Sequence, residues 1–173
     1  MDRVYDLVDR RDKVIRRGTK EAAKASRLFT RSVHIILENR SGKIMLCTRP
    51  MTKKSYPGMM TSSAGGHVER GETYEKAARR ELFEELGLKL RLKDAGRFDV
   101  VNRRERAIHR LFVGKLKKES FLLDVGEVSA YKFLNPETIA KDIKKHPRRY
   151  AAPFHGAFRK YLEHKKLYNT LNV

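Results

Sequence analysis

A chain of 173 residues with 40% apolar and 35% charged side chains is long enough for one domain with a buried core. The single cysteine, Cys47, excludes an internal disulfide and a thiolate metal cluster, and no run approaches the roughly 18 apolar residues of a membrane span. We therefore expect a single cytoplasmic domain over residues 1–173 that does not associate with membranes.

The net charge of +19 is large for this length and is spread along the chain. It occurs without an aromatic-interleaved stacking motif, a helix-turn-helix or zinc-ligand spacing. A basic surface that attracts polyanionic substrates is therefore favoured over dedicated nucleic-acid binding.

The first half of the chain predicts short strands around one helix. Residues 1–30 contain two strands and a helix, for which Thr19 is a candidate N-cap. A β-branched run then predicts a central strand, and a turn with glycine joins it to a hairpin partner. The expected elements are strands at 4–9, 13–16, 32–37 and 43–48, a helix at 19–28 and a turn at 39–42.

The second half alternates helices and strands. A loop over 50–60 leads into a glycine-containing segment, and a helix follows from the candidate cap Thr73 to Gly87, which suits a left-handed C-terminal residue. Further expected elements are strands at 98–101, 107–116 and 128–134, a helix from 136 to about 145, and a terminal helix within 153–173, spanning about 154–167. This order predicts an α/β (α+β) fold with a mixed sheet between helical layers.

Three carboxylates fall on one side of the helix that Thr73 begins. Glu81, Glu84 and Glu85 are spaced so that they are neighbours within one helical turn. Like charges placed in this way repel one another and destabilise the helix by about 0.2–0.5 kcal/mol per pair. A bound cation would remove that repulsion, and Mg²⁺ takes carboxylate and phosphate oxygens together.

The segment from Gly66 to Leu88 resembles the Nudix box, G-x5-E-x7-R-E-U-x-E-E-x-G-U, where U is a bulky aliphatic residue. Every defined position is matched in this chain, by Gly66, Glu72, Arg80, Glu81, Leu82, Glu84, Glu85, Gly87 and Leu88. The resemblance implies an α/β/α sandwich and a Mg²⁺-dependent hydrolase (Mn²⁺ is an alternative metal) that cleaves a pyrophosphate bond in a nucleoside diphosphate linked to another moiety. Its partner would be a small phosphorylated substrate, bound by a monomer or a homodimer.

The resemblance also implies roles for the box residues. Glu81, Glu84 and Glu85 form the expected metal set, and one of them, or a glutamate from a distant loop, acts as the base. The backbone carbonyl of Gly65 would complete the coordination, because adjacent Gly65 and Gly66 let the backbone approach closely.

The sequence makes less specific predictions for residues other than these three glutamates. Glu72 and Arg80 match box positions that pair with each other and brace the loop before the helix. Glu127 precedes the last strand, where related enzymes often carry a loop glutamate, so it is a candidate base or extra ligand. His67 and His109 would either contact substrate or metal, or serve packing and hydrogen bonding.

A wider resemblance, over residues 3–135, is to the isopentenyl-diphosphate-isomerase-like branch of these hydrolases. It is carried by residues 4–9, 43–49 and 53–59. Isomerisation is the disfavoured alternative, because the acid/base cysteine of that enzyme corresponds to Gly65 here. A non-catalytic nucleotide- or RNA-binding module is a second alternative, disfavoured by the complete set of box carboxylates. The residues after the box, around 103–105, carry no known substrate signature.

Overall fold

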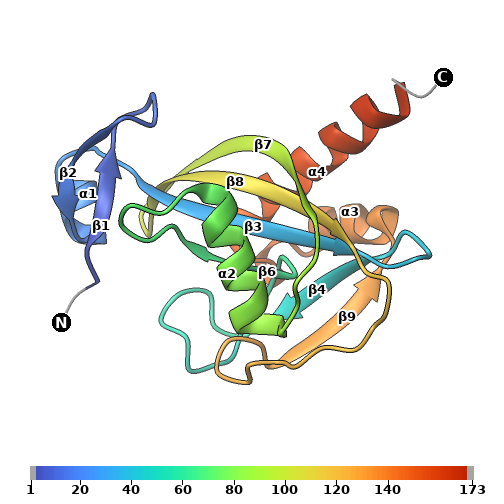
Figure 1. The fold of residues 1–173 in the computed structure, drawn as a ribbon. Coiled ribbons are helices and arrows are strands. Elements are labelled where there is room, and N and C mark those ends of the chain that lie inside the picture. The colour runs from blue at the N-terminus through green and yellow to red at the C-terminus, as the bar shows by residue number, and fades with distance from the viewer. Residues whose placement is uncertain (1–2, 171–173) are drawn as a thin grey trace.

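The computed structural model describes residues 3–170, which form two sheets and four α-helices (Figure 1). The N-terminal unit consists of β1 (Tyr5–Val8), β2 (Val14–Gly18) and α1 (Lys20–Ala25). The remaining strands are β3 (Thr30–Glu38), β4 (Ile44–Thr48), β5 (Met60–Thr61), β6 (Ala64–His67), β7 (Leu92–Val101), β8 (Arg106–Lys115) and β9 (Ala130–Leu134). The remaining helices are α2 (Tyr74–Leu86), α3 (Pro136–Lys145), the short 3-10 helix η1 (Pro147–Arg149) and α4 (Ala152–Thr170).

The larger sheet is mixed, as the sequence predicts. Its main order is β5-β4-β3-β8-β7, while β6 pairs with β3 and β9 pairs with β4. Only β3 and β8 run parallel among these pairs, in a register from Thr30↔Ala107 to Glu38↔Lys115. The hairpin expected between β3 and β4 is present, but its pairing is limited to Glu38↔Ile44. The edge of β3 that β8 leaves free is shared, because residues 32–35 on it pair with β6.

Helices cover both faces of this sheet (Figure 1). On one face, α2 packs its apolar stripe of Ala77, Ala78, Leu82 and Leu86 against Val33, Ile35 and Leu37 of β3. On the other face, α4 packs Phe154, Phe158 and Tyr161 against Ile36 and Leu111. The predicted α/β/α arrangement is confirmed. Within the described residues, no helix is both long and apolar enough to cross a membrane.

Several element boundaries differ from the sequence expectation. The first helix stops at Ala25 rather than near residue 28, because the Ser26 hydroxyl donates to the Ala22 carbonyl and Arg27 takes a left-handed φ of 56°. Strand β7 begins at Leu92 rather than at residue 98, and a bulge between Asp94 and Gly96 hides its alternation.

Two short strands, β5 and β6, lie in the segment that the sequence indicates only as a continuation of the loop. They form because β4 and β3 offer free edges to them. The last strand begins at Ala130 rather than at residue 128, and α4 begins at Ala152. The end of the expected terminal helix, residues 171–173, lies outside the described residues.

Local signals define helix α2 (Tyr74–Leu86), which carries the three glutamates of the box. The Thr73 hydroxyl accepts a hydrogen bond from the Lys76 amide (3.3 Å), which caps the first turn. Gly87 ends the helix with φ 66°, a left-handed conformation that glycine adopts at little cost. Since the apolar stripe faces the sheet, the adjoining edge of the helix carries Glu81 and Glu85 towards β6.

Candidate active site

A cleft of about 680 Å³ lies where α2, β6, the loop after β4, the N-terminal unit and the β7–β8 turn meet. All three box glutamates after Arg80 line this cleft, together with Gly65 and Gly66. The structure therefore brings the sequence-predicted site residues to one place, opposite segments that are far from the box in the sequence.

The three glutamates differ in their environments. Glu81 and Glu85 are buried, at 9% and 8% exposed, whereas the side chain of Glu84 is 54% exposed. Burial raises the pKa of the Glu81 carboxyl, although hydrogen bonding from Arg80 opposes the rise. Burial raises the pKa of Glu85 well above its ordinary value, and the neighbouring charges of Glu81 and Glu127 add to the effect.

The glycines of β6 create the room in which these carboxylates lie. A Cβ atom on Gly66 would stand 2.2 Å from Oε1 of Glu81, so any side chain at residue 66 would displace that carboxylate. A Cβ atom on Gly65 would stand 2.5 Å from the backbone oxygen of Val33 on the paired strand. The missing side chain therefore makes room for a site carboxylate at Gly66 and for the backbone of the neighbouring strand at Gly65.

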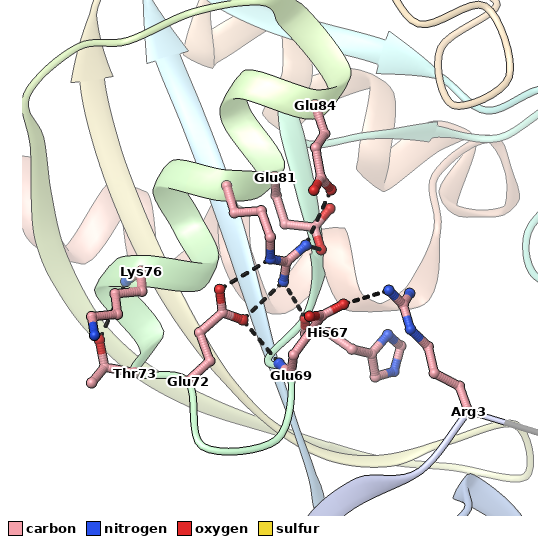
Figure 2. Close-up of polar contacts among 9 residues, drawn as sticks. Arg3, His67, Glu69, Glu72, Thr73, Lys76, Glu81 and Glu84 are labelled. Carbon is pink, nitrogen blue, oxygen red and sulfur yellow. Dashed lines mark hydrogen bonds and ion pairs between the residues drawn. The ribbon is translucent and has the colours of Figure 1, made fainter.

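The guanidinium of Arg80 makes several hydrogen bonds at the edge of this site, to partners that include Glu72, Glu81 and Glu84, which are labelled in Figure 2. Its Nε and Nη2 donate to the two carboxylate oxygens of Glu72 at 3.0 and 2.9 Å, and Nη2 also donates to the His67 carbonyl at 3.0 Å. Its Nη1 donates to Glu81 at 2.8 Å and to Glu84 at 3.1 Å. The bonds to Glu72 are the largest cause that raises the pKa of Arg80, so the guanidinium stays charged.

The bonds from Arg80 to Glu81 and Glu84 go beyond the bracing role expected from the sequence. They place a cation between two carboxylates of the expected metal set. Within residues 3–170 no group of three or more His, Cys, Asp or Glu side chains is arranged to hold a metal ion. Glu85 does not take part in the Arg80 cluster. A backbone hydrogen bond from Gly65 opposes the rise that burial causes in the pKa of its carboxyl, but the pKa stays raised.

Many cationic side chains also line the cleft, and sequence reasoning assigned none of them to the site. They come from the N-terminal unit, the loop after β4 and the β7–β8 turn: Arg3, Lys20, Lys24, Arg49, Lys53, Lys54, Arg104 and Arg106. The even spread of positive charge along the sequence gave no signal for this gathering, because it depends on which loops meet in the fold. A cleft with this lining attracts polyanions.

Glu127 lies on the rim of the same cleft, as the sequence expectation requires for a loop ligand or base. Its carboxylate forms an ion pair with Lys53 (2.6 Å) and remains 41% exposed. Its charge also contributes to the raised pKa of Glu85, which shows that the two carboxyls lie within electrostatic reach of each other.

Both histidines singled out from the sequence line the cleft. Burial lowers the pKa of His67 to about 3, with a further contribution from Lys20, so this ring is neutral near pH 7. The His67 ring packs 5.1 Å from the ring of Tyr5. His109 donates through Nε2 to a carboxylate oxygen of Glu105 at 3.1 Å, and its ring stacks on Phe98.

Comparison with known proteins agrees with this geometry. The NUDIX domain model matches residues 28–154. An uncharacterised Nudix hydrolase of Salmonella typhi, YfcD, is 34% identical over 135 residues, which cover 78% of this chain and 73% of that protein. An isopentenyl-diphosphate Delta-isomerase 2 of Photorhabdus laumondii is 32% identical over 140 residues, with 78% of each chain covered.

Among solved structures, that of DR0079 from Deinococcus radiodurans is similar, with a TM-score of 0.72 and 25% identity. The match covers 86% of this chain and 91% of that one. The region that the family model matches contains the box and strands β3 to β9. The chain belongs to the NUDIX family of pyrophosphohydrolases.

Proposed function

We propose that this protein is a Mg²⁺-dependent hydrolase that cleaves a pyrophosphate bond in a nucleoside diphosphate linked to another moiety. The observation that carries the proposal is the pair of buried carboxylates, Glu81 and Glu85, in a cleft that is otherwise lined by many cations. Buried carboxylates beside a cationic, phosphate-attracting surface suit a reaction in which metal and phosphate oxygens meet.

Carboxylate and carbonyl oxygens are the donors that a hard divalent cation takes, although these glutamates would have to leave their present arrangement to hold one. Glu81, Glu84 and Glu85 would hold Mg²⁺ or Mn²⁺, with the Gly65 carbonyl as a further oxygen donor. Burial penalises the charged forms of Glu81 and Glu85 and raises their pKa values, and a bound cation would offset that penalty. Binding requires Glu81 and Glu84 to exchange their hydrogen bonds with Arg80 for the metal.

The metal supplies charge neutralisation at the phosphates and activation of a water. The protein residues position the reacting groups. The cationic side chains of Arg49 and Lys53 would bind the non-bridging phosphate oxygens, and a carboxylate among Glu81, Glu84, Glu85 and Glu127 would accept the proton of the attacking water.

Arg80 and Glu72 act on the reaction indirectly, by positioning other residues. Through its paired hydrogen bonds, Arg80 joins the loop before α2 to the helix itself and holds the Glu81 carboxylate against Gly66. The bidentate geometry with Glu72 restricts the guanidinium to one plane. We infer a positioning role for this pair.

A substrate panel with a metal requirement tests the proposal. Purified protein is incubated with nucleotide sugars, dinucleotides, nucleoside di- and triphosphates and capped RNA, with Mg²⁺, with Mn²⁺ or with chelator, and the phosphorylated products are separated by chromatography and quantified. We expect turnover of at least one substrate that stops with chelator and falls by about 100-fold or more in Glu85→Gln.

Glu75→Gln is the matched control, because Glu75 is an exposed acid in the first turn of the same helix, outside the residues that line the cleft. It should keep wild-type turnover. Absence of metal-dependent turnover across the panel, or equal activity of the two glutamine variants, contradicts the proposal. Capped RNA alone as a substrate would instead assign the basic charge to nucleic acid.

The relative from Photorhabdus laumondii supports the isomerase alternative, whereas the geometry of the site argues against it. Residue 65 is glycine, and a side chain there would meet the Val33 carbonyl at 2.5 Å, so this backbone does not accommodate the cysteine that the isomerase resemblance requires. Turnover of isopentenyl diphosphate by the wild-type protein would reverse this assignment.

A further inference from the structure

Two polar atoms on the wall of the cleft are buried without partners. His109 is 3% exposed and Tyr56 is 8% exposed, and both residues line the cleft. Within the described part of the chain, neither Nδ1 of His109 nor the hydroxyl of Tyr56 has a hydrogen-bond partner. Since buried polar atoms in folded proteins are nearly always paired, these atoms point to a ligand.

The His109 ring is held in one orientation by its neighbours. Its Nε2 contacts a carboxylate oxygen of Glu105 at 3.1 Å, and its face stacks on Phe98 with 4.9 Å between ring centroids and 11° between planes. The ring of His34 packs at 5.2 Å. A carboxylate oxygen accepts hydrogen bonds, so Nε2 is the donor in this contact and Nδ1 is the ring atom left to pair with a ligand.

Tyr56 lies beside the same β7–β8 turn. The Arg104 guanidinium stands 5.4 Å from its ring centroid, and Arg104 is adjacent to Glu105, the partner of His109. Burial raises the pKa of the Tyr56 hydroxyl; the charge of Glu105 adds to the rise, and the nearby Asn102 amide opposes it without a hydrogen bond of normal geometry. Tyr56 has a φ of 55°, which is uncommon for a residue other than glycine.

These features favour a ligand group that hydrogen-bonds to His109 Nδ1 and to the Tyr56 hydroxyl, close to cations. An apolar chain would leave both atoms unpaired, and a site built to hydrogen-bond its substrate rejects an analogue that lacks the matching groups. A nucleobase supplies N–H donors and acceptors along one flat edge and is linked to phosphates that the cationic lining attracts.

We propose that His109 Nδ1 and the Tyr56 hydroxyl form the recognition subsite for the nucleobase of the substrate. This assignment rests on the proposed function, since it concerns the part of the substrate that does not react. It makes the base, rather than the phosphates alone, a determinant of affinity.

Binding of non-hydrolysable probes tests the subsite without any need for turnover. AMP, CMP, GMP and UMP are titrated into the protein by calorimetry and compared with ribose 5-phosphate, which lacks only the base. We expect at least one nucleotide to bind about tenfold or more tightly than ribose 5-phosphate, as one or two added hydrogen bonds would produce.

Two variants localise the effect. His109→Phe keeps a ring against Phe98 but removes Nδ1, and Tyr56→Phe removes one hydroxyl; each should reduce the preference for the nucleotide severalfold or more, with ribose 5-phosphate affinity unchanged. Tyr131→Phe is the matched control, because Tyr131 packs on Phe121 outside the residues lining the cleft, and it should keep the full preference.

Equal binding of ribose 5-phosphate and all four nucleotides overturns the proposal, and so does a preference that survives both substitutions. If His109→Phe does not fold, the single-hydroxyl change at Tyr56 still decides the outcome. A base preference without metal-dependent turnover would support the subsite while contradicting the hydrolase assignment. Turnover without any base preference would do the reverse.

Discussion

Substitution of the two adjacent glycines of β6 by alanine should affect different properties of the protein. At Gly66 the new Cβ atom would meet the end of the Glu81 side chain, with contacts of 2.2–2.6 Å to its carboxylate atoms. At Gly65 it would meet the backbone of Val33 on the neighbouring strand, at 2.5 Å from the oxygen. A side chain can rotate away from such a contact, whereas a paired strand has to shift.

The expected magnitudes follow from this difference. Gly65→Ala should destabilise the protein by about 1–3 kcal/mol, the usual range for overpacking, and lower the Tm by about 2–4 °C for each kcal/mol in a domain of this size. Gly66→Ala should change stability by less than about 1 kcal/mol, because the clash is relieved by rotation of Glu81. Displacement of that carboxylate should lower hydrolytic turnover by about 100-fold.

Thermal denaturation and metal-dependent product formation, measured on both variants, check these values. Calorimetric titration of Mn²⁺ adds a direct readout of the glutamate site, and should show weaker binding in Gly66→Ala. The reasoning is refuted if Gly66→Ala keeps wild-type turnover and Mn²⁺ affinity. It is also refuted if the two variants lose equal amounts of stability and activity.

Three further predictions concern buried groups and one ion pair. Tyr161→Phe should lower the free energy of unfolding by about 1–3 kcal/mol in denaturant titrations, since the Tyr161 hydroxyl donates to the buried carboxylate of Glu38. In the control variant Tyr131→Phe, at an exposed position, the free energy of unfolding should stay within about 0.5 kcal/mol of the wild-type value. Burial acts to raise the pKa of Glu72, but the hydrogen bonds from Arg80 and from the Glu69 backbone, with the charges of Arg80 and Lys76, together lower it. The stabilisation is therefore complete above the ordinary pKa of about 4.5 and is lost as the pH falls through the depressed value. The stability difference between wild type and Glu72→Gln should shrink below about pH 4.5, and a constant difference between pH 7 and pH 3 would contradict this. Burial raises the pKa of Cys47, so its thiol should resist a disulfide reagent at pH 8 until denaturant is added, and rapid labelling of the native protein would count against the buried position.

Local sequence signals predicted helix α2 well. Its cap at Thr73, its apolar stripe and its left-handed end at Gly87 all depend on residues within a few positions of one another. Helix α3 also begins at Pro136 and ends at Lys145 as its sequence indicates. These elements were predictable because neighbouring residues along the chain decide them.

The strands were less predictable where pairing partners decide them. Strand β6 has two glycines in four residues and forms against β3 rather than by its own propensity. Strand β7 extends back to Leu92 through charged residues because β8 supplies a partner along its whole length. The parallel pairing of β3 with β8 joins residues 77 positions apart, which no local pattern reports.

The sequence by itself determined the family and the acidic pattern of the site, since the spacing of Glu72, Arg80, Glu81, Glu84 and Glu85 is a one-dimensional property. Only the tertiary structure decided which carboxylates are buried, where the scattered cations gather, and which polar atoms of the cleft lack partners. The physical reason is that burial and electrostatic environment depend on contacts between segments that are distant in the chain. The same box spacing would therefore suit many substrates, and the walls of the cleft select among them.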